Sequence, residues 1–434
     1  MLALSTLYLG LNYLWASYNS LILPGQVTRV FLPEDQDLAL GLIAALGVGG
    51  GLSVNILVGG LSDKVSVLWG RRSPFILIGV SLSALLMILE AWMPLNATCV
   101  VVAYALMQMF SNAIQGAFRP LLPDLIPKNQ RGEAAGMLGL FTMLGVSLGY
   151  GLTGYELGSM HVRYALFLSA ALLLVSSLPT LLVLKGEDTG MATGYSVLGA
   201  LKDSFKPSET TPGFFSFLGG TFLVYAGSAG LVYFEPNYMK VMLGVANPDY
   251  GIAVSGTTVL ISAAVSAVAL GMVSDRFGRR QILLSAAVAG GIFMLMLSLS
   301  RSFLLFLFFA ALLGAVAGIF MSVRNATASD LVPPSATGKY MAYANLAVGI
   351  PSVAGPAADG LILCGMGGDA MGFRVLFLFS GCLYFLGAFM LSRIRDLRNG
   401  SGHFSVGCPR PSPCLGGLFL ETVLLALLGA AWGS

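Results

Sequence analysis

The chain of 434 residues is 56% hydrophobic and only 10% charged, and its mean hydropathy is +0.84. Soluble domains carry roughly 25% charged residues, so this composition excludes an ordinary water-soluble globular protein. The formal net charge of +3 is small, and no basic block with interleaved aromatic residues occurs, which argues against a nucleic-acid-binding protein.

Apolar runs of about 20 residues recur along the chain, which is the length that an α-helix needs to cross a bilayer. Backbone groups in lipid must be paired internally, and these continuous runs lack the alternation of barrel strands. We therefore expect an all-α membrane protein with twelve transmembrane helices. The expected spans are 3–24, 39–59, 74–94, 97–118, 134–157, 162–184, 213–235, 250–273, 281–300, 303–324, 337–363 and 372–394.

The first run begins almost at Met1 without a basic segment before it, and it continues to Pro24 without a small-residue cleavage pattern. A secretory signal has a basic start, a shorter apolar core and such a cleavage site. We interpret residues 3–24 as a first membrane span rather than as a removed signal peptide.

A loop motif follows the second span and recurs after the eighth. Residues 59–64 read Gly-Gly-Leu-Ser-Asp-Lys, and Gly-Arg-Arg follows at 70–72; residues 271–280 read Gly-Met-Val-Ser-Asp-Arg-Phe-Gly-Arg-Arg. A second pair of landmarks is Arg119 with Asp124 after the fourth span, and Arg324 with Asp330 after the tenth. Two landmarks at matching places indicate a duplicated chain, a plan found in transporters whose substrate site lies between the repeats near the bilayer midplane.

The longest polar stretch between spans, 185–212, contains mixed charges and two prolines and predicts a linker. We expect an N-terminal six-helix bundle (1–184), a cytoplasmic linker (185–212), a C-terminal six-helix bundle (213–394) and a cytoplasmic or interfacial tail (395–434). The apolar run at 415–433 is interrupted by Glu421 and is only marginally long enough to cross, so we favour an interfacial helix or a segment foreign to the fold.

The basic residues are distributed unequally between the two sets of loops. Placing the 60–73 loop in the cytoplasm leaves only five of the 23 basic residues outside: Arg29, Arg163, Lys240, Arg301 and Arg374. Because Lys and Arg favour the cytoplasmic side, both termini are expected there. No segment addressed to an organelle is visible, so we expect the plasma membrane or a bacterial inner membrane.

These motifs resemble the major facilitator superfamily, whose signature loop is G-x-x-x-D-R-x-G-R-R. They resemble in particular its sucrose/proton symporter-like branch, of the glycoside-pentoside-hexuronide type. There a longer insert precedes Gly-Arg-Arg and Pro-Phe follows, as in residues 63–75 here. Residues 112–125 are similar to that branch's N-x-x-Q-G-x-x-R-x-L-L-x-D-L. The resemblance implies two pseudo-symmetric six-helix bundles and secondary transport.

The repeated loops predict a conformational latch. Asp63 lies where a helix leaves the membrane among basic residues, and a carboxylate there can accept paired hydrogen bonds from Arg and meet a helix N-terminus. The resemblance implies that this network bridges the bundles on the cytoplasmic side when the cavity faces out; the alternative is charge that only sets topology. The expected gating residues are Asp63, Lys64, Gly70, Arg71, Arg72, Arg119, Asp124, Asp275, Arg276, Gly278, Arg279, Arg280, Arg324 and Asp330.

Polar and aromatic residues inside apolar spans are candidates for substrate binding. Aromatic rings stack on the C–H faces of sugars, and amides exchange hydrogen bonds with hydroxyl groups. Asn12, Trp15 and Asn19 are spaced to share one helix face. The alternatives are hydrogen bonds between helices and aromatic residues at the membrane interface. The candidates are Asn12, Trp15, Asn19, Gln108, Asn112, Gln115, Tyr225, Tyr343 and Asn345.

Proton coupling needs a titratable group within the membrane. The resemblance places the proton carrier, an Asp, seven residues before Gln115, where this chain has Gln108, which cannot titrate. The remaining candidates are Glu90, Glu156, Glu235 and Asp359, and Glu90 is the most embedded of them. The alternative for each is an exposed charge at a helix end.

We expect a secondary transporter that works by alternating access and is not an enzyme. The first hypothesis is a sugar substrate, a disaccharide or other glycoside, moved with a proton; the alternatives are a drug or metabolite exporter and a non-transporting receptor or scaffold. No phosphate-binding loop occurs. Five cysteines without a C-x-x-C pair, and two histidines, predict no metal site. We expect no cofactor, a small-molecule substrate, the lipid bilayer as surroundings, and a monomer.

Overall fold

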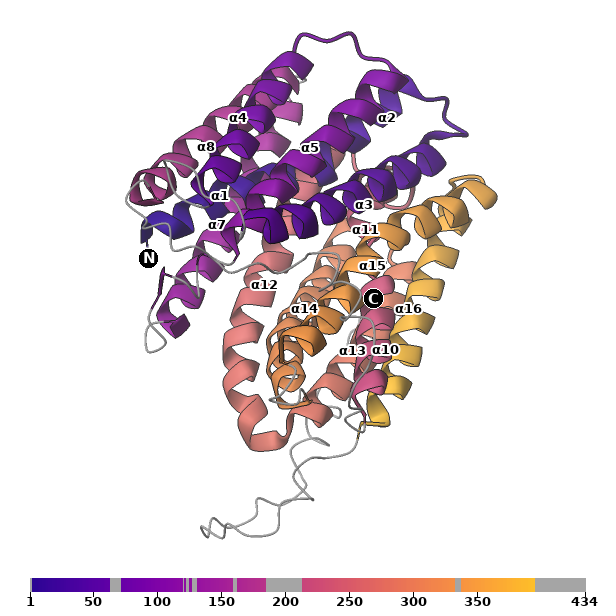
Figure 1. Cartoon of the computed structure of the whole chain (residues 1–434). Helices are drawn as coiled ribbons and strands as arrows, with labels where there is room; N and C mark the ends of the chain where they lie inside the picture. Colours follow the sequence, from indigo (N-terminus) through magenta and orange to yellow (C-terminus); the bar gives the residue numbers. More distant parts are fainter. Residues whose placement is uncertain are drawn as a thin grey trace. The chain divides into compact units, whose positions relative to one another are not determined.

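The computed structural model describes residues 2–62, 72–119, 121, 125–126, 131–158, 162–184, 213–331 and 337–394. The elements within these ranges are helical (Figure 1), which confirms the predicted all-α class. The first half contains α1 (Leu2–Ser17), η1 (Tyr18–Ile22), α2 (Leu23–Val30), α3 (Gln36–Ser62), α4 (Ser73–Glu90), α5 (Ala97–Phe118), α7 (Arg131–Gly158) and α8 (Val162–Leu184). The second half contains α10 (Phe214–Ala226), α11 (Leu231–Val241), α12 (Pro248–Phe277), α13 (Arg279–Leu299), α14 (Phe303–Leu331), α15 (Thr337–Gly365) and α16 (Ala370–Ser392).

Among the residues that the structure describes, eleven helical segments are long and apolar enough to cross a membrane. They coincide with the second to twelfth expected spans, with ends that differ by several residues. The expected first span falls on α1, η1 and the start of α2. The seventh combines α10 and α11, over Phe214–Val241. The prediction of an integral membrane protein is therefore confirmed.

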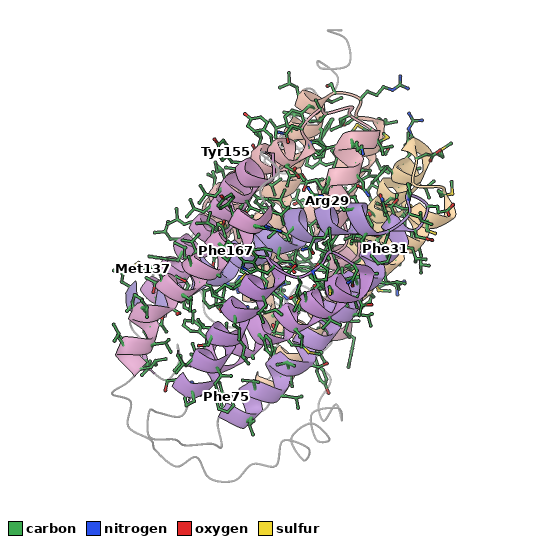
Figure 2. All side chains as sticks on the ribbon, turned by 90° about the horizontal axis from the view of Figure 1, so that it is seen from above. Arg29, Phe31, Phe75, Met137, Tyr155 and Phe167 are labelled. Atoms are coloured by element: carbon green, nitrogen blue, oxygen red, sulfur yellow. The ribbon has the colours of Figure 1, made fainter. Side chains whose placement is uncertain are left out.

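Large apolar side chains on the outer faces of these helices are exposed in the isolated chain. Leu46 is 66% exposed, Tyr155 76% and Leu304 78%. Figure 2 shows the side chains that project from the helices, with Tyr155 labelled. Water-soluble monomers rarely expose apolar patches on this scale, whereas lipid tails solvate such residues without penalty.

The first and seventh spans are both interrupted, for different local reasons. Pro24 lacks an N–H group, and its ring would clash with the carbonyl group four residues earlier, so a regular helix cannot continue through it unchanged. The chain instead forms the π turn η1, closed by the bond from the Leu23 N–H to the Tyr18 carbonyl. In the seventh span, Gly227 and Gly230 bound the short break between α10 and α11.

The helices pair within two groups. In the first half, α1 packs against α7 and α8, and α5 packs against α3 and α4; in the second, α12 packs against α14, and α16 against α10 and α13. The halves meet where α3 contacts α15, α7 contacts α12, and η1 contacts α11. Residues 1–394 form one compact unit. This pairing is that of the predicted two six-helix bundles, whereas the expected linker and tail lie outside the described residues.

Several helix pairs approach so closely that only glycine fits between them. A Cβ atom at Gly145 of α7 would lie 2.3 Å from the Leu9 carbonyl oxygen of α1, and one at Gly318 of α14 would lie 2.1 Å from the Ala263 carbonyl oxygen of α12. Small residues at such positions let membrane helices gain van der Waals contact between their backbones.

We expect Gly145→Ala to lower the free energy of unfolding by about 1–3 kcal/mol, because the added methyl group forces α1 and α7 apart. Gly139 lies on the same helix, and a Cβ atom added there would have no neighbour within 4 Å. Gly139→Ala is the matched control and should be neutral or slightly stabilising. Thermal unfolding of both variants in detergent measures the difference; equal midpoints would contradict the close packing.

Candidate functional site

The π turn η1 binds three different helices through three consecutive side chains. The Tyr18 hydroxyl donates to Glu90 Oε1 of α4 at 2.5 Å. Asn19 Oδ1 accepts hydrogen bonds from α5, and the Ser20 hydroxyl donates to the Tyr150 hydroxyl of α7 at 3.2 Å. A π turn is wider than an α-helical turn and is often found at functional sites. We call Tyr18, Asn19 and Ser20 the hub.

A central cluster of four neutral polar side chains is centred on Asn19. Tyr104 and Gln108 lie one turn apart on α5 and donate to Asn19 Oδ1 at 3.1 and 3.0 Å. Gln108 Nε2 also lies 2.7 Å from the Tyr104 hydroxyl, which in turn lies 3.2 Å from the Tyr233 hydroxyl of α11. The Tyr104–Tyr233 contact joins the two halves of the chain. Asn19, Tyr104, Gln108 and Tyr233 are the central cluster.

The central cluster offers amide and hydroxyl groups and carries no charge. Tyr104, Gln108 and Tyr233 are buried, and hydrogen bonds within the cluster connect them. Each of these groups can exchange such a bond for one to a ligand hydroxyl group without leaving a buried charge unpaired. The cluster is therefore suited to a neutral, polyhydroxylated ligand.

Glu90 is connected directly to the hub. Its Oε1 accepts hydrogen bonds from Tyr18 and, at 2.6 Å, from Gln26 Nε2 of α2. Its Oε2 is buried and has no hydrogen-bond partner among the described residues. The expected span 74–94 would have placed Glu90 in its interior, whereas α4 ends at Glu90. The Glu90 carboxylate is nevertheless directed into the protein. Hydrogen bonds thus hold Oε1, whereas Oε2 is available to accept a proton.

Neither Glu235 nor Asp359 is hydrogen-bonded to the central cluster in the described contacts. Glu235, on α11, accepts a 2.5 Å hydrogen bond from the Ser255 hydroxyl of α12. Asp359 of α15 is buried, and its Oδ2 lies so close to Gly230 that a Cβ atom there would be 2.1 Å away. It therefore packs into the break between α10 and α11. The side chain of Glu156 lies outside the described residues.

The helix ends that carry the fewest basic residues form a seam between the halves. Asn237 Nδ2 of α11 donates to Asp37 Oδ1 of α3 at 2.7 Å, and Asp37 is buried. Beside it, a Cβ atom at Gly41 would lie 2.3 Å from the Pro356 carbonyl oxygen of α15. A charge-assisted hydrogen bond next to close backbone packing holds this end closed.

Removing the Asp37 carboxylate should open the seam. A buried hydrogen bond to a charged group contributes about 1.5–3 kcal/mol, so Asp37→Ala should shift the equilibrium toward an open seam by roughly 10- to 100-fold. Nitroxide labels at Glu34 and Met366, on loops from the two halves, would report this as a larger fraction of long distances. Asp35→Ala, an exposed neighbour, is the control; an unchanged distance distribution in Asp37→Ala would show that the bond does not hold the seam.

Those of the expected gating residues that the structure describes lie at the opposite helix ends. Arg72 is buried at the N-cap of α4, Gly278 has φ +96° before α13, Arg279 is half-buried, and Arg280 donates to the Ser392 carbonyl oxygen. Asp63, Lys64, Gly70, Arg71 and Asp124 lie outside the described residues, as do the side chains of Asp275, Arg276 and Asp330.

Two of the expected gating arginines occupy matching places in the two halves. Arg119, just after α5, lies close enough to Tyr8 of α1 to interact electrostatically with its hydroxyl group, and the Tyr8 ring centroid lies 4.9 Å from that of Phe118. Arg324 of α14 lies over the Tyr225 ring of α10 at 5.6 Å, and Tyr225 contacts Phe320. The same Arg–Tyr pairing in both halves agrees with the duplication that the sequence predicts.

The remaining substrate candidates do not gather at one point. Trp15 donates to Ser111, Asn12 donates to the Tyr8 carbonyl oxygen of its own helix, and Gln115 accepts from Asn55 of α3. Asn112 lies 3.4 Å from Gln108 Oε1, at the edge of the central cluster. Tyr343 is half-buried and Asn345 exposed on α15. Trp15 and Asn19 both reach α5, whereas the Asn12 amide bonds within α1.

Sequence reasoning missed Tyr104, Tyr18, Tyr150, Gln26 and Asp37. Tyr104 lies four residues before Gln108, so a helix places both on one face, and that spacing could have found it. Asp37 follows Glu34 and Asp35 in a polar stretch and has no feature that separates it from loop charges.

Comparison with known proteins gives one family and several relatives. The family model "Major Facilitator Superfamily" matches residues 4–205 and 217–432. The sucrose transport protein SUC4 of Arabidopsis thaliana is 29% identical over 173 residues, which are 36% of this chain and 33% of that protein. The multidrug resistance protein MdtG of Escherichia coli is 33% identical over 172 residues, 38% of this chain and 40% of that protein. Each match thus spans well under half of the relative.

Solved structures share the fold. The nucleoside transporter NupG superimposes with a TM-score of 0.69 over 91% of this chain and 98% of its own, at 14% identity. A bacterial homolog of the human lysosomal transporter Spinster, in an inward-facing and occupied conformation, gives a TM-score of 0.68 over 91% and 96%, at 15% identity. At such identities the likeness concerns the fold alone.

Proposed function

This chain belongs to the Major Facilitator Superfamily of membrane transporters, and from that premise we propose that it is a sugar symporter that moves a disaccharide or other glycoside together with a proton. Its transport cycle is alternating access, in which the two six-helix bundles rock about a site between them. The branch resemblance of residues 63–75 and 112–125, and the partial similarity to SUC4, support a sugar substrate.

The observation that carries this proposal is the central cluster. It lies where η1 and α11 bring the halves together, it consists of two amides and two tyrosine hydroxyl groups, and it contains no charged side chain. Sugars are bound by such groups, with aromatic rings against their apolar faces. Glu90, one hydrogen bond from the hub, is the proposed proton carrier in place of the family's aspartate at Gln108.

The conformation agrees with one end state of the cycle. The Asp37–Asn237 seam closes the ends that the distribution of basic residues assigns to the outside. At the other ends, Arg119, Arg280 and Arg324 each contact residues of their own half. The closed seam supports an inward-facing state, and the distribution of basic residues supports cytoplasmic termini. The monomeric state and the plasma or bacterial inner membrane stay predictions.

Uptake of labelled sucrose or maltose into proteoliposomes with an imposed pH gradient tests the proposal. We expect accumulation that a protonophore abolishes and that protein-free liposomes do not show. The absence of gradient-dependent uptake for every sugar tried would remove the symport hypothesis.

The alternative is drug or metabolite efflux, which the similarity to MdtG favours. It predicts that a lipophilic dye preloaded into the vesicles leaves faster when the gradient is imposed, while sucrose does not move. Running both substrates through the same preparation separates the two functions.

A further inference from the structure

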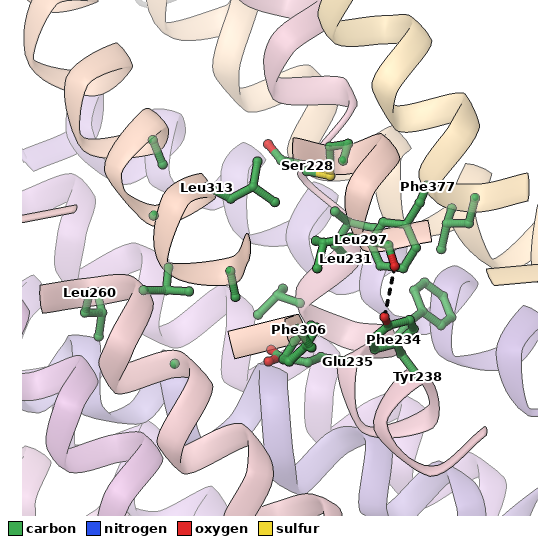
Figure 3. A pocket seen from close by; sticks show the side chains of 18 of the residues that line it. Ser228, Leu231, Phe234, Glu235, Tyr238, Leu260, Leu297, Phe306, Leu313 and Phe377 are labelled. Atoms are coloured by element: carbon green, nitrogen blue, oxygen red, sulfur yellow. Dashed lines mark hydrogen bonds between the residues drawn. The ribbon is translucent and has the colours of Figure 1, made fainter. Parts of the chain in front are cut away.

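A cavity lies mostly among helices of the C-terminal half, and the central cluster does not line it. Its volume is about 290 Å³, and it is lined by residues of α11, α12, α13, α14 and α16 (Figure 3), together with Val146 and Tyr150 of α7. The sugar proposal gives this cavity no role.

Aromatic rings form one wall of the cavity. The Tyr238 ring lies 5.3 Å from Phe306, 5.6 Å from Phe373 and 5.1 Å from Phe377, measured between ring centroids. All four residues line the cavity. The Tyr238 hydroxyl donates to the Leu297 carbonyl oxygen at 3.1 Å, as Figure 3 shows, so the polar end of this ring is already satisfied. The wall therefore offers ring surface rather than hydrogen-bonding groups.

Glu235 adds a carboxylate to this aromatic wall. It lies three residues before Tyr238 on α11, so a helix places both side chains on the same face. Among the described residues that line the cavity, Glu235 is the single charged one, and none is Lys, Arg or His. Ser255 donates one hydrogen bond to Oε1, which satisfies part of the carboxylate but supplies no positive charge.

We propose that this cavity binds an organic ammonium ion with one aromatic ring or a comparable apolar group. Ring faces attract cations, most strongly where water is excluded, and quaternary ammonium groups are recognised by aromatic cages. A carboxylate in an apolar wall supplies the opposite charge and selects against anions. The volume is at the lower end of the roughly 300–1,000 Å³ of small-molecule sites, which limits the ligand to one ring and its substituent. The walls are mostly apolar side chains, which suit this ligand better than a sugar.

Phenyltrimethylammonium and tert-butylbenzene form a suitable probe pair, because they have the same shape and differ in charge. Titration calorimetry on the full-length protein should show that the ammonium ion binds at least about tenfold more tightly than its neutral isostere. Glu235→Gln keeps the acceptor for Ser255 and should remove most of that preference while leaving the affinity for tert-butylbenzene within a few-fold. Because binding is measured without transport, the result is independent of the sugar proposal.

Two further variants and a control variant keep the test decisive. Phe306→Leu should weaken binding of the ammonium ion several-fold more than binding of the isostere. Leu313→Trp fills the cavity and should weaken binding of both probes. Glu34→Gln removes a carboxylate in an exposed loop and should change the affinity for neither probe. Equal affinity for the two probes, an unchanged preference in Glu235→Gln, or no binding of phenyltrimethylammonium would each overturn the proposal.

Discussion

Replacing Asn19 with alanine is expected to lower the initial rate of sugar uptake by at least about 30-fold. The substitution removes the oxygen that accepts hydrogen bonds from both Tyr104 and Gln108. An unsatisfied buried donor costs about 1–3 kcal/mol, and two donors at the low end of that range correspond to roughly a 30-fold change. The measurement is uptake of labelled sucrose per mole of reconstituted protein.

A double-mutant cycle distinguishes the cluster from general damage to the fold. Gln108→Ala removes one of the two donors, so in the Asn19→Ala background it should reduce uptake much less than it does alone. Effects of the two substitutions that simply multiply would show that Asn19 and Gln108 act independently. Ser53→Ala, which removes a hydroxyl group that donates to the Gly49 carbonyl oxygen of its own helix, serves as the control.

Glu90→Gln is expected to abolish proton-driven accumulation of sugar but to spare exchange of internal for external sugar. Glutamine has nearly the same shape, and its oxygen can accept from Tyr18 and Gln26 as Glu90 Oε1 does. It cannot take up or release a proton, so the sugar gradient should fall to equal concentrations on both sides. Accumulation and counterflow, measured in the same proteoliposomes, give the two readouts.

Glu34 allows a matched comparison with Glu90, because Glu34→Gln makes the same chemical change at an exposed position outside the site. Full accumulation is expected in that variant. Undiminished accumulation in Glu90→Gln would clear Glu90 of the coupling role, and loss of exchange as well as accumulation would assign it a structural role instead.

The spans could be predicted from sequence because the requirement is simple: about 20 apolar residues in a row. Eleven described segments follow the expected ranges closely. The duplication could also be predicted, from the repeated motifs, and the Arg119–Tyr8 and Arg324–Tyr225 pairs agree with it. The π turn was not predicted, since Pro24 is equally compatible with the end of a helix. It directs Tyr18, Asn19 and Ser20 toward three different helices.

The site was harder to predict because long-range pairing decides it. Asn19 and Gln108 were identified as polar residues in apolar spans, but Tyr233 joins them only because α11 contacts η1 across the two halves. Asp37 resembles several loop charges in sequence, and only its contact with Asn237 distinguishes it. Glu235 and Glu90 look alike in sequence, and only the aromatic wall around one and the hub beside the other separate them.

The neutrality of the central cluster has an electrical consequence. If the ligand is uncharged and the only group that changes charge is a single glutamate, each cycle carries one net positive charge across the bilayer. Such a cycle responds to voltage as well as to pH: about 2.3 kcal/mol is available per 100 mV, enough for roughly a 50-fold concentration ratio. A membrane potential with no pH difference would then suffice to concentrate the sugar, and the associated current would reverse sign with the direction of the sugar gradient.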